Sequence, residues 1–194
     1  MSLEERSYRV LVVSAADKFN NVMSEYLSEA GYRSIHFETS ISAAQRTTSE
    51  RSFDFVIINS PLPDDPGKRY AIDLSTSGST VVLIVVRADI FDEINEKVSK
   101  HGVYVMPKPM SKPIMEMGIK WMASSRERLR KTEKKTLSIE EKMEEIRTVN
   151  RAKWLLISEL KMDEPGAHRY IEKQAMDRCV SKREVAEEII KTYS

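Results

Sequence analysis

Short apolar runs alternate with segments of helical periodicity up to about residue 121 of the chain. The runs are rich in β-branched residues, which predicts strands. They lie at residues 8–14, 34–39, 53–59, 79–86 and 103–107. Most are apolar on both faces, which is typical of strands in a parallel sheet that helices cover on both sides. The run at 34–39 is less apolar and is expected near an edge.

The intervals between these runs have apolar residues at helical spacing and are expected to be helices. The expected helices lie at residues 19–27, 40–50, 67–76, 89–100 and 112–122. Ser40 is a candidate cap of the second helix, Gly102 ends the fourth, and Ile114, Met117 and Trp121 share one side of the last. Because strands alternating with helices form βαβ units, the sequence predicts an α/β, flavodoxin-like doubly wound parallel five-stranded sheet.

Ligands of doubly wound sheets bind outside the carboxyl ends of the strands. Here the strand ends lie at residues 14–17, 59–63, 86–87 and 108–109. Asp17 is expected to cap the first helix, and Asp64 and Asp65 are expected to be solvated turn residues beyond the third strand. The chemistry of this domain is therefore expected at these stretches.

From about residue 122 the strand pattern stops, and Glu, Lys, Arg and Leu dominate. A 3-4 spacing gives a short heptad seam. Its positions are Leu129, Thr132, Thr136, Ile139, Met143, Ile146, Asn150 and Lys153. The seam favours a parallel coiled-coil dimer, although its polar members make it weak; the alternative is one amphipathic face packed within the monomer. Ser138 and Glu141 have capping-box spacing, so a helix break is expected near residue 137.

Three helical stretches are expected at the end of the chain, at 151–162, after Pro165 up to residue 178, and at 181–193. Ser181 and Glu184 have the spacing of a capping box that opens the last one. These stretches predict a three-helix output domain behind the all-α helical segment. The expected domains are therefore residues 7–121, a helical linker or coiled coil at 122–135, and residues 136–194.

Composition adds limits on compartment and partners. The 194 residues carry a net charge of +1, so the chain as a whole shows no general polyanion-binding character. A single cysteine, Cys179, excludes an intrachain disulfide framework. Residues 1–9 have no apolar core of a signal peptide, and the longest apolar run, 81–86, is too short to span a bilayer. We expect a cytoplasmic protein with no membrane partner.

Three stretches of the first domain resemble the receiver domain of response regulators: "VLVVSAAD" (10–17), "FDFVIINSPLPDDPG" (53–67) and "GVYVMPKPM" (102–110). The last contains the Lys-Pro pair that closes the receiver site. The resemblance implies an acidic pair after the first strand that binds magnesium, since a hard cation prefers carboxylate oxygens. It also implies an aspartate nucleophile ending the third strand. A hydroxyl and a lysine that contact the phosphoryl oxygens end the fourth and fifth strands.

The chain departs from this pattern at all but one position. The acidic pair aligns with Ser14 and Ala15, the nucleophile with Asn59 and the hydroxyl with Val86, while Lys108 alone matches. A carboxamide cannot form the acyl phosphate that aspartate forms. We therefore predict a pseudo-receiver that is not phosphorylated and holds no magnesium, in which Lys108 hydrogen-bonds the Asn59 oxygen and loop carbonyls.

Residues 136–194 resemble the ANTAR domain, over "RAKWLLISELKMDEPGAHRYIEKQAMD" (151–177) and "SKREVAEEII" (181–190). The resemblance lies in Ala152-Lys153, in Glu164 and Ala167, and in the stretches 174–177 and 185–186. Trp154 departs from the small residue that the family commonly has. The resemblance implies binding of paired short stem-loops in nascent transcripts, which keeps a terminator hairpin from forming.

RNA recognition needs cations for phosphates and flat groups for unstacked bases. The candidate cations are Arg151, Lys153, Arg169, Lys173 and Arg178. Trp154, Tyr170 and His168 are candidate stacking groups, although Trp154 and Tyr170 are expected in the core and His168 simply exposed. Ala152 and Ala175 are expected to permit close helix contacts.

The sequence thus predicts a regulator and not an enzyme, because it has no nucleophile–base pair, phosphate loop or metal cluster. No cofactor is expected. Control is expected from a regulatory protein or a small ligand on the receiver, or from homodimerisation, since two linked weak sites gain avidity. The alternatives are a DNA-binding response regulator, for which the turn at 161–166 is long, and a protein-interaction adaptor.

Overall fold

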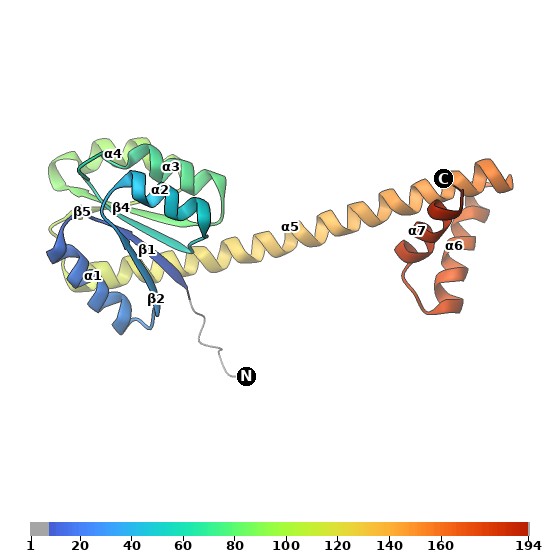
Figure 1. The fold of residues 1–194 in the computed structure, drawn as a ribbon, viewed down its shortest axis with the longest axis horizontal. Coiled ribbons are helices and arrows are strands. Elements are labelled where there is room, and N and C mark those ends of the chain that lie inside the picture. Colours follow the sequence, from blue (N-terminus) through green and yellow to red (C-terminus); the bar gives the residue numbers. More distant parts are fainter. Residues whose placement is uncertain (1–7, 194) are drawn as a thin grey trace. The chain divides into compact units, whose positions relative to one another are not determined.

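A computed structural model describes residues 8–193 (Figure 1). Residues 1–7 lie outside the described residues. The expectation that the chain has no signal peptide depends mainly on these residues. The chain divides into two compact units, Met1–Arg130 and Lys131–Ser194. None of the helices described is long and apolar enough to cross a membrane.

The first unit contains the predicted five-stranded parallel sheet, in the order β2-β1-β3-β4-β5. The strands are β1 Arg9–Val13, β2 Ser34–Glu38, β3 Phe55–Asn59, β4 Val81–Arg87 and β5 Tyr104–Lys108. The less apolar β2 lies at an edge, as its composition predicts. The flavodoxin-like fold class is therefore confirmed, with each strand within two residues of its predicted bounds.

Helices cover both faces of the sheet (Figure 1). The helix α1 (Asp17–Glu29) and the start of α5 lie on one face, and α2 (Ile41–Glu50), α3 (Lys68–Ser77) and α4 (Phe91–Val98) lie on the other. Two 3-10 turns, Ala88–Ile90 and Ser99–His101, flank α4. Because successive side chains of a strand point to opposite faces, each central strand contributes to two separate cores.

Helix ends in this unit are set by local contacts. Ser40 caps α2 as predicted, since its side chain accepts a hydrogen bond from the Ala43 N–H at 3.1 Å. Asp17 is not the cap of α1. Ser14 Oγ accepts the Ala16 N–H at 3.2 Å, so Ala16 becomes the N-cap and Asp17 the first helical residue. There the Asp17 carboxylate lies at the positive end of the helix dipole.

The helix α5 runs unbroken from Lys112 to Leu160 over 49 residues, so the break expected near residue 137 is wrong. Between Gly118 and Pro165 the chain has neither glycine nor proline. A serine at position 138 costs a helix interior only a few tenths of a kcal/mol, roughly, which strong helix formers on either side outweigh.

A buried ion cluster fixes α5 to the amino end of the sheet. Asp54 is only 6% exposed. Its Oδ1 lies 2.9 Å from both Arg126 Nε and Arg130 NH2, and its Oδ2 accepts the Arg9 N–H at 2.9 Å. Burial alone raises the pKa of Asp54, but the Arg9 N–H and the two guanidinium groups outweigh this, so the net pKa is lowered. The cluster joins β1, the segment before β3 and α5.

The second unit packs the end of α5 against α6 (Glu164–Arg178) and α7 (Lys182–Tyr193). Its buried core consists of Ala152, Leu156, Ala167, Ile171, Ala175, Val185, Ala186 and Ile189. The helix α6 begins one residue before Pro165 and not after it, because proline is tolerated in a first helical turn. The predicted capping box is present: Ser181 N–H donates to Glu184 Oε2, and Glu184 N–H donates to Ser181 Oγ.

Candidate functional sites

The carboxyl ends of β1, β3 and β5 are joined by a chain of hydrogen bonds. The Asn59 amide donates to Ser14 Oγ at 3.0 Å, and both residues are buried. Lys108 Nζ donates to Asn59 Oδ1 at 2.8 Å and to the Ser60 carbonyl at 2.6 Å. The predicted contact of Lys108 with Asn59 and a loop carbonyl is therefore confirmed.

The remaining positions of this site are apolar. Val86 is fully buried at the end of β4, and Ala15 is exposed beyond β1. Burial, and then the nearby Arg87, lower the pKa of the Lys108 ammonium. None of positions 14, 15 and 59 supplies a carboxylate. Residues 8–193 contain no cluster of three or more His, Cys, Asp or Glu side chains that could hold a metal ion. The arrangement is a cation held by neutral oxygens.

The loop after β3 is tied to α2. Asp64 Oδ1 accepts the Ile41 N–H at 3.0 Å, and Asp64 Oδ2 accepts the Ser42 N–H at 2.9 Å. The hydrogen bond from the Ser42 N–H, and to a smaller extent that from the Ile41 N–H, lower the pKa of Asp64 to about 2. Asp65 accepts the Gly67 N–H at 2.6 Å. Asp64 and Asp65 are exposed residues of the loop beyond β3, as predicted, but both also accept backbone N–H groups, which the sequence did not indicate.

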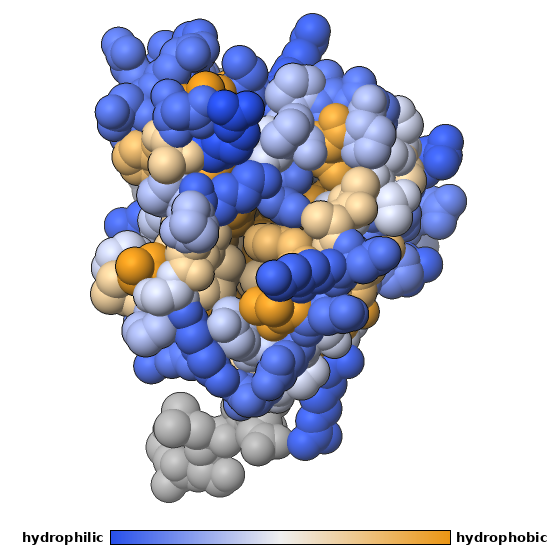
Figure 2. All heavy atoms as spheres, turned by 90° about the vertical axis from the view of Figure 1, so that its left-hand side faces the viewer, coloured by the Kyte–Doolittle hydropathy of each residue, from blue (hydrophilic) through white to orange (hydrophobic). Residues whose placement is uncertain are grey.

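Apolar surface lies between charged side chains on the side of this unit where the strands have their carboxyl ends (Figure 2). On α5, the buried residues are Met115, Ile119 and Met122. The side chains predicted to share one side of this helix, Ile114, Met117 and Trp121, are about half exposed. They leave an apolar face of α5 uncovered by the described residues of this unit.

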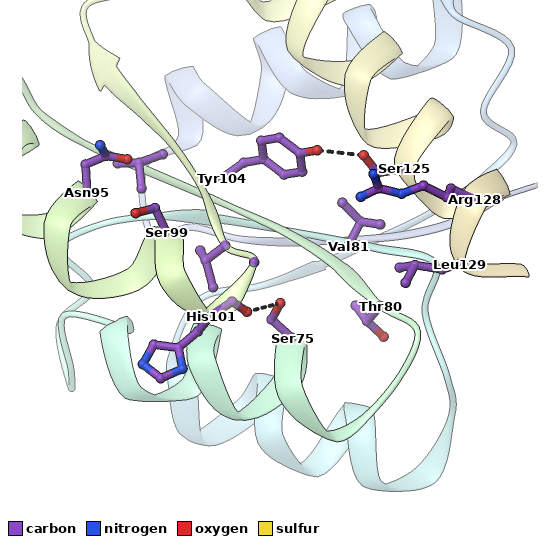
Figure 3. Close-up of a pocket in the computed structure, with 13 residues that line it drawn as sticks. Ser75, Thr80, Val81, Asn95, Ser99, His101, Tyr104, Ser125, Arg128 and Leu129 are labelled. Atoms are coloured by element: carbon purple, nitrogen blue, oxygen red, sulfur yellow. Dashed lines mark hydrogen bonds between the residues drawn. The ribbon is translucent and has the colours of Figure 1, made fainter. Parts of the chain in front are cut away.

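A hollow of about 480 Å³ lies beside the edge strand β5, near the amino ends of β4 and β5 (Figure 3). Two hydrogen bonds join residues that line it. Ser75 Oγ donates to the His101 carbonyl at 2.9 Å, and the Tyr104 and Ser125 hydroxyls lie 2.6 Å apart. These contacts tie α3 to the turn before β5, and β5 to α5. Sequence reasoning missed this hollow because its lining comes from distant segments.

The five candidate RNA-binding cations do not form a single cluster. Lys153 Nζ lies 2.6 Å from Glu164 Oε1, and the Arg178 guanidinium makes two hydrogen bonds to Glu188. The other three are exposed, and none makes an ion pair within residues 8–193; they are Arg151, Arg169 and Lys173. Lys153 and Arg169 line one hollow, which the rest do not line.

The stacking candidates are more exposed than the sequence predicts. Trp154 is 71% exposed and Tyr170 is also exposed, so their expected place in the core is wrong. Ala152 is buried against the other helices, and a side chain two residues further along a helix points to the opposite side. Ala152 and Ala175 are buried and His168 is exposed, as predicted. An indole ring is thus presented to solvent beside Arg151.

A model of the ANTAR domain matches residues 138–190, which cover all three helices of the second unit. The chain carries an ANTAR domain behind its α/β domain. The chain is 23% identical over 184 residues to the transcriptional regulatory protein PdtaR of Mycobacterium tuberculosis, covering 95% of this chain and 90% of that protein.

Receiver domains are among the solved structures that are similar to the first unit. One is the signal receiver domain of an HD domain-containing protein from Pseudomonas fluorescens, with 17% identity, a TM-score of 0.59, and coverage of 68% of this chain and 96% of that one. Another is a CheY-like receiver domain from Methanospirillum hungatei, with 16% identity, a TM-score of 0.57, and coverage of 63% and 98%. At these identities the likeness shows the fold.

Proposed function

We propose that this protein is a non-enzymatic regulator whose ANTAR domain binds paired stem-loops in nascent RNA and so prevents a terminator from forming. The observation that carries the proposal is the exposed Trp154 beside Arg151, a flat ring and an unpaired cation on one helix. PdtaR, its relative, is a transcriptional regulatory protein. The proposed division is a receiver-like domain at 7–121, a linker at 122–135 and an RNA-binding domain at 136–194.

A gel shift separates this function from its alternatives. The full chain is expected to bind tandem stem-loop RNA more tightly than duplex DNA of equal charge. Arg151→Ala and Lys153→Ala are expected to weaken RNA binding, because each removes a cation from the proposed surface. Equal, salt-sensitive binding to both nucleic acids would indicate electrostatics alone, and a preference for DNA would indicate a DNA-binding regulator. Binding to neither nucleic acid would favour the alternative of a protein-interaction adaptor.

The receiver domain is proposed to act without phosphorylation. Lys108 donates a hydrogen bond to the Asn59 side-chain oxygen, and Ser14 and Ala15 offer no carboxylate for magnesium. Control then comes from a regulatory protein or a small ligand, and the exposed face of Ile114, Met117 and Trp121 suits a protein partner. We expect incubation with a small phosphodonor and magnesium to leave the mass of the intact protein unchanged. Phosphoryl transfer to Asn59 or any neighbour would refute this.

A parallel homodimer is the proposed assembly. Its support is that Ile139 and Met143 are 49% and 55% exposed, so the seam is not packed within the monomer at these two positions. Ile146 is 59% exposed but lines a hollow with Asn150 and Lys153, so Ile139 and Met143 are the exposed apolar seam positions that lie outside that hollow.

The double variant Ile139→Lys, Met143→Lys is expected to shift the protein from dimer to monomer, because like charges would face each other across the seam. Light scattering after size exclusion measures the mass. Leu137→Lys, an equally exposed apolar position outside the heptad pattern, is the matched control. A variant mass equal to that of the unaltered protein would contradict a dimer built on this seam.

A further inference from the structure

The hollow of about 480 Å³ beside β5, which we name the β5 hollow, belongs to the first unit alone. Its volume lies within the range of roughly 300–1,000 Å³ that is usual for small-molecule sites. Its lining comes from α3, α4, β4, β5 and α5 and from the turns between them. It lies near the amino ends of β4 and β5, whereas Ser14, Asn59 and Lys108 lie at the carboxyl ends of their strands. The β5 hollow is therefore separate from the degenerate phosphorylation site.

The charge in the β5 hollow comes from residues that carry positive charge. Arg128 on α5 is permanently positive, and His101 is the other residue of the lining that can become positive. Among the described residues, no aspartate or glutamate lines the hollow. A guanidinium group binds a carboxylate or a phosphate through parallel N–H groups. The lining therefore favours an anionic ligand over a cationic one.

Two hydroxyl groups in the lining are restricted to accepting hydrogen bonds. Ser75 Oγ donates its hydrogen to the His101 carbonyl at 2.9 Å, and Thr80 Oγ1 donates its hydrogen to the Phe53 carbonyl at 2.8 Å. Because a hydroxyl group has one hydrogen and two lone pairs, each of these oxygens can still accept a hydrogen bond but has no hydrogen left to donate. A ligand pairs with them through donors of its own, which alcohol groups supply.

A hydroxyl pair and apolar side chains complete the lining (Figure 3). The Tyr104 and Ser125 hydroxyls lie 2.6 Å apart, and one of them donates to the other. One hydroxyl hydrogen of the pair is therefore left to donate to a ligand oxygen. The apolar side chains are those of Val81, Val103, Val105 and Leu129. The lining thus combines acceptors, a donor, a cation and surface for carbon atoms.

We propose that the β5 hollow binds a small organic anion that is rich in hydroxyl groups, such as a sugar acid. Its carboxylate lies at Arg128, and its hydroxyl groups donate to Ser75 and Thr80. The ligand connects α5 to β5 at the edge of the sheet. This gives the proposed control of the receiver domain by a small ligand a site and a chemical class, and it rests on that part of the proposed function.

Thermal unfolding of the full-length protein tests the class of ligand. Gluconate, a hydroxylated monoanion, is expected to raise the midpoint of the first unit's transition by roughly 4 °C when its concentration is about ten times its Kd. Acetate lacks the hydroxyl groups and glucitol lacks the charge, so each is expected to give a clearly smaller shift at the same concentration. No shift with gluconate, or an equal shift with acetate or glucitol, would overturn the proposal.

Variants test the cation and the space inside the hollow. Arg128→Gln is expected to weaken gluconate binding about tenfold, because it removes hydrogen bonds between charged groups. Ser99→Trp, at an exposed position of the lining, is expected to abolish binding by filling the hollow. Arg69→Gln is the matched control, since Arg69 is an exposed arginine of α3 that does not line the hollow. Isothermal titration calorimetry measures Kd, and equal values for Arg128→Gln and Arg69→Gln would contradict the proposed role of Arg128.

NMR of the unaltered full-length protein locates the ligand without any variant. The backbone amides whose signals move on addition of gluconate are expected to lie at residues 99–105 and 125–129. The competing cation of this unit is Lys108, at the carboxyl ends of the strands. Signals that move only at residues 14–17, 59–63 and 108 would show that the anion binds there, and the proposal would be wrong.

The outcomes separate this site from the proposed function. If gluconate does not bind and a small phosphodonor leaves the protein unlabelled, the proposed site is wrong and the phosphorylation-independent receiver domain stands. If gluconate binds in the β5 hollow but the phosphodonor labels the protein, the site stands and the proposed phosphorylation-independent control fails.

Discussion

Asp54→Ala is expected to lower the free energy of unfolding of the receiver unit by about 3–5 kcal/mol, the usual cost of breaking a buried ion pair. The substitution leaves the buried Arg126 guanidinium without the carboxylate that lies 2.9 Å from its Nε. It also leaves the Arg9 N–H without its acceptor. Urea denaturation followed by circular dichroism measures the change, with the receiver transition expected at lower denaturant.

Asp73→Ala is the matched control, because Asp73 forms a solvent-exposed ion pair with Arg69 at 4.0 Å. Such pairs contribute about 0–1 kcal/mol. Acid provides an independent check. The folded-state pKa of Asp54 is lowered, so its stabilisation is present above its unfolded pKa of about 3.9 and is lost as pH falls through the folded value. Asp54→Asn should remove this part of the acid sensitivity. Equal stability of Asp54→Ala and the control would contradict the role of the cluster.

Ile171→Ala is expected to cost the ANTAR unit about 2–5 kcal/mol, through lost burial and the cavity left behind. Ile171 is almost fully buried among the residues that join α5, α6 and α7. A small three-helix core has little stability to spare, so this loss is expected to unfold much of the unit at 37 °C. Loss of helical circular dichroism on heating, together with loss of RNA binding, is the expected result.

Met176→Ala on the same helix is its control, because Met176 is 78% exposed and is expected to change stability by less than about 0.5 kcal/mol. A melting curve of Ile171→Ala that coincides with that of Met176→Ala would show that α6 does not depend on this core. The receiver transition should be unchanged in both variants, because Ile171 lies outside the Met1–Arg130 unit.

The elements that sequence predicts well are those whose signals are local. The sheet strands, the Ser40 cap and the Ser181–Glu184 capping box all depend on residues within a few positions of one another. The bonds of Asp64 to the start of α2 have no local sequence signal, because that helix begins 23 residues earlier in the chain. The Asp54–Arg126 pair spans 72 residues, and no periodicity indicates it.

Two predictions failed although their signals were local: the break in helix α5 and the burial of Trp154. A capping-box spacing predicts a helix start only where the chain has left helical conformation, and nothing at residue 137 makes it do so. Trp154 is large and apolar, which favours the core on average. The side of α5 that packs is set by Ala152 and Leu156, and it excludes Trp154. The contact between Asn59 and Lys108 could be predicted from the sequence, because the residues of this site lie at the ends of strands of one sheet.

The hydrogen-bond chain of Ser14, Asn59 and Lys108 makes it difficult for single substitutions to restore a site that could be phosphorylated. An aspartate at position 59 alone would deprive Ser14 Oγ of the N–H that it now accepts, and Ser14 and Ala15 would still offer no ligand for magnesium. A carboxylate at 14 or 15 alone would place a charge beside a neutral amide that cannot take a phosphoryl group. No one of these single steps gives the site both a phosphoryl acceptor and carboxylate ligands for magnesium. A lineage that has reached this arrangement is expected to keep it, and its signalling is expected to diversify through surfaces instead of through the phosphorylation site.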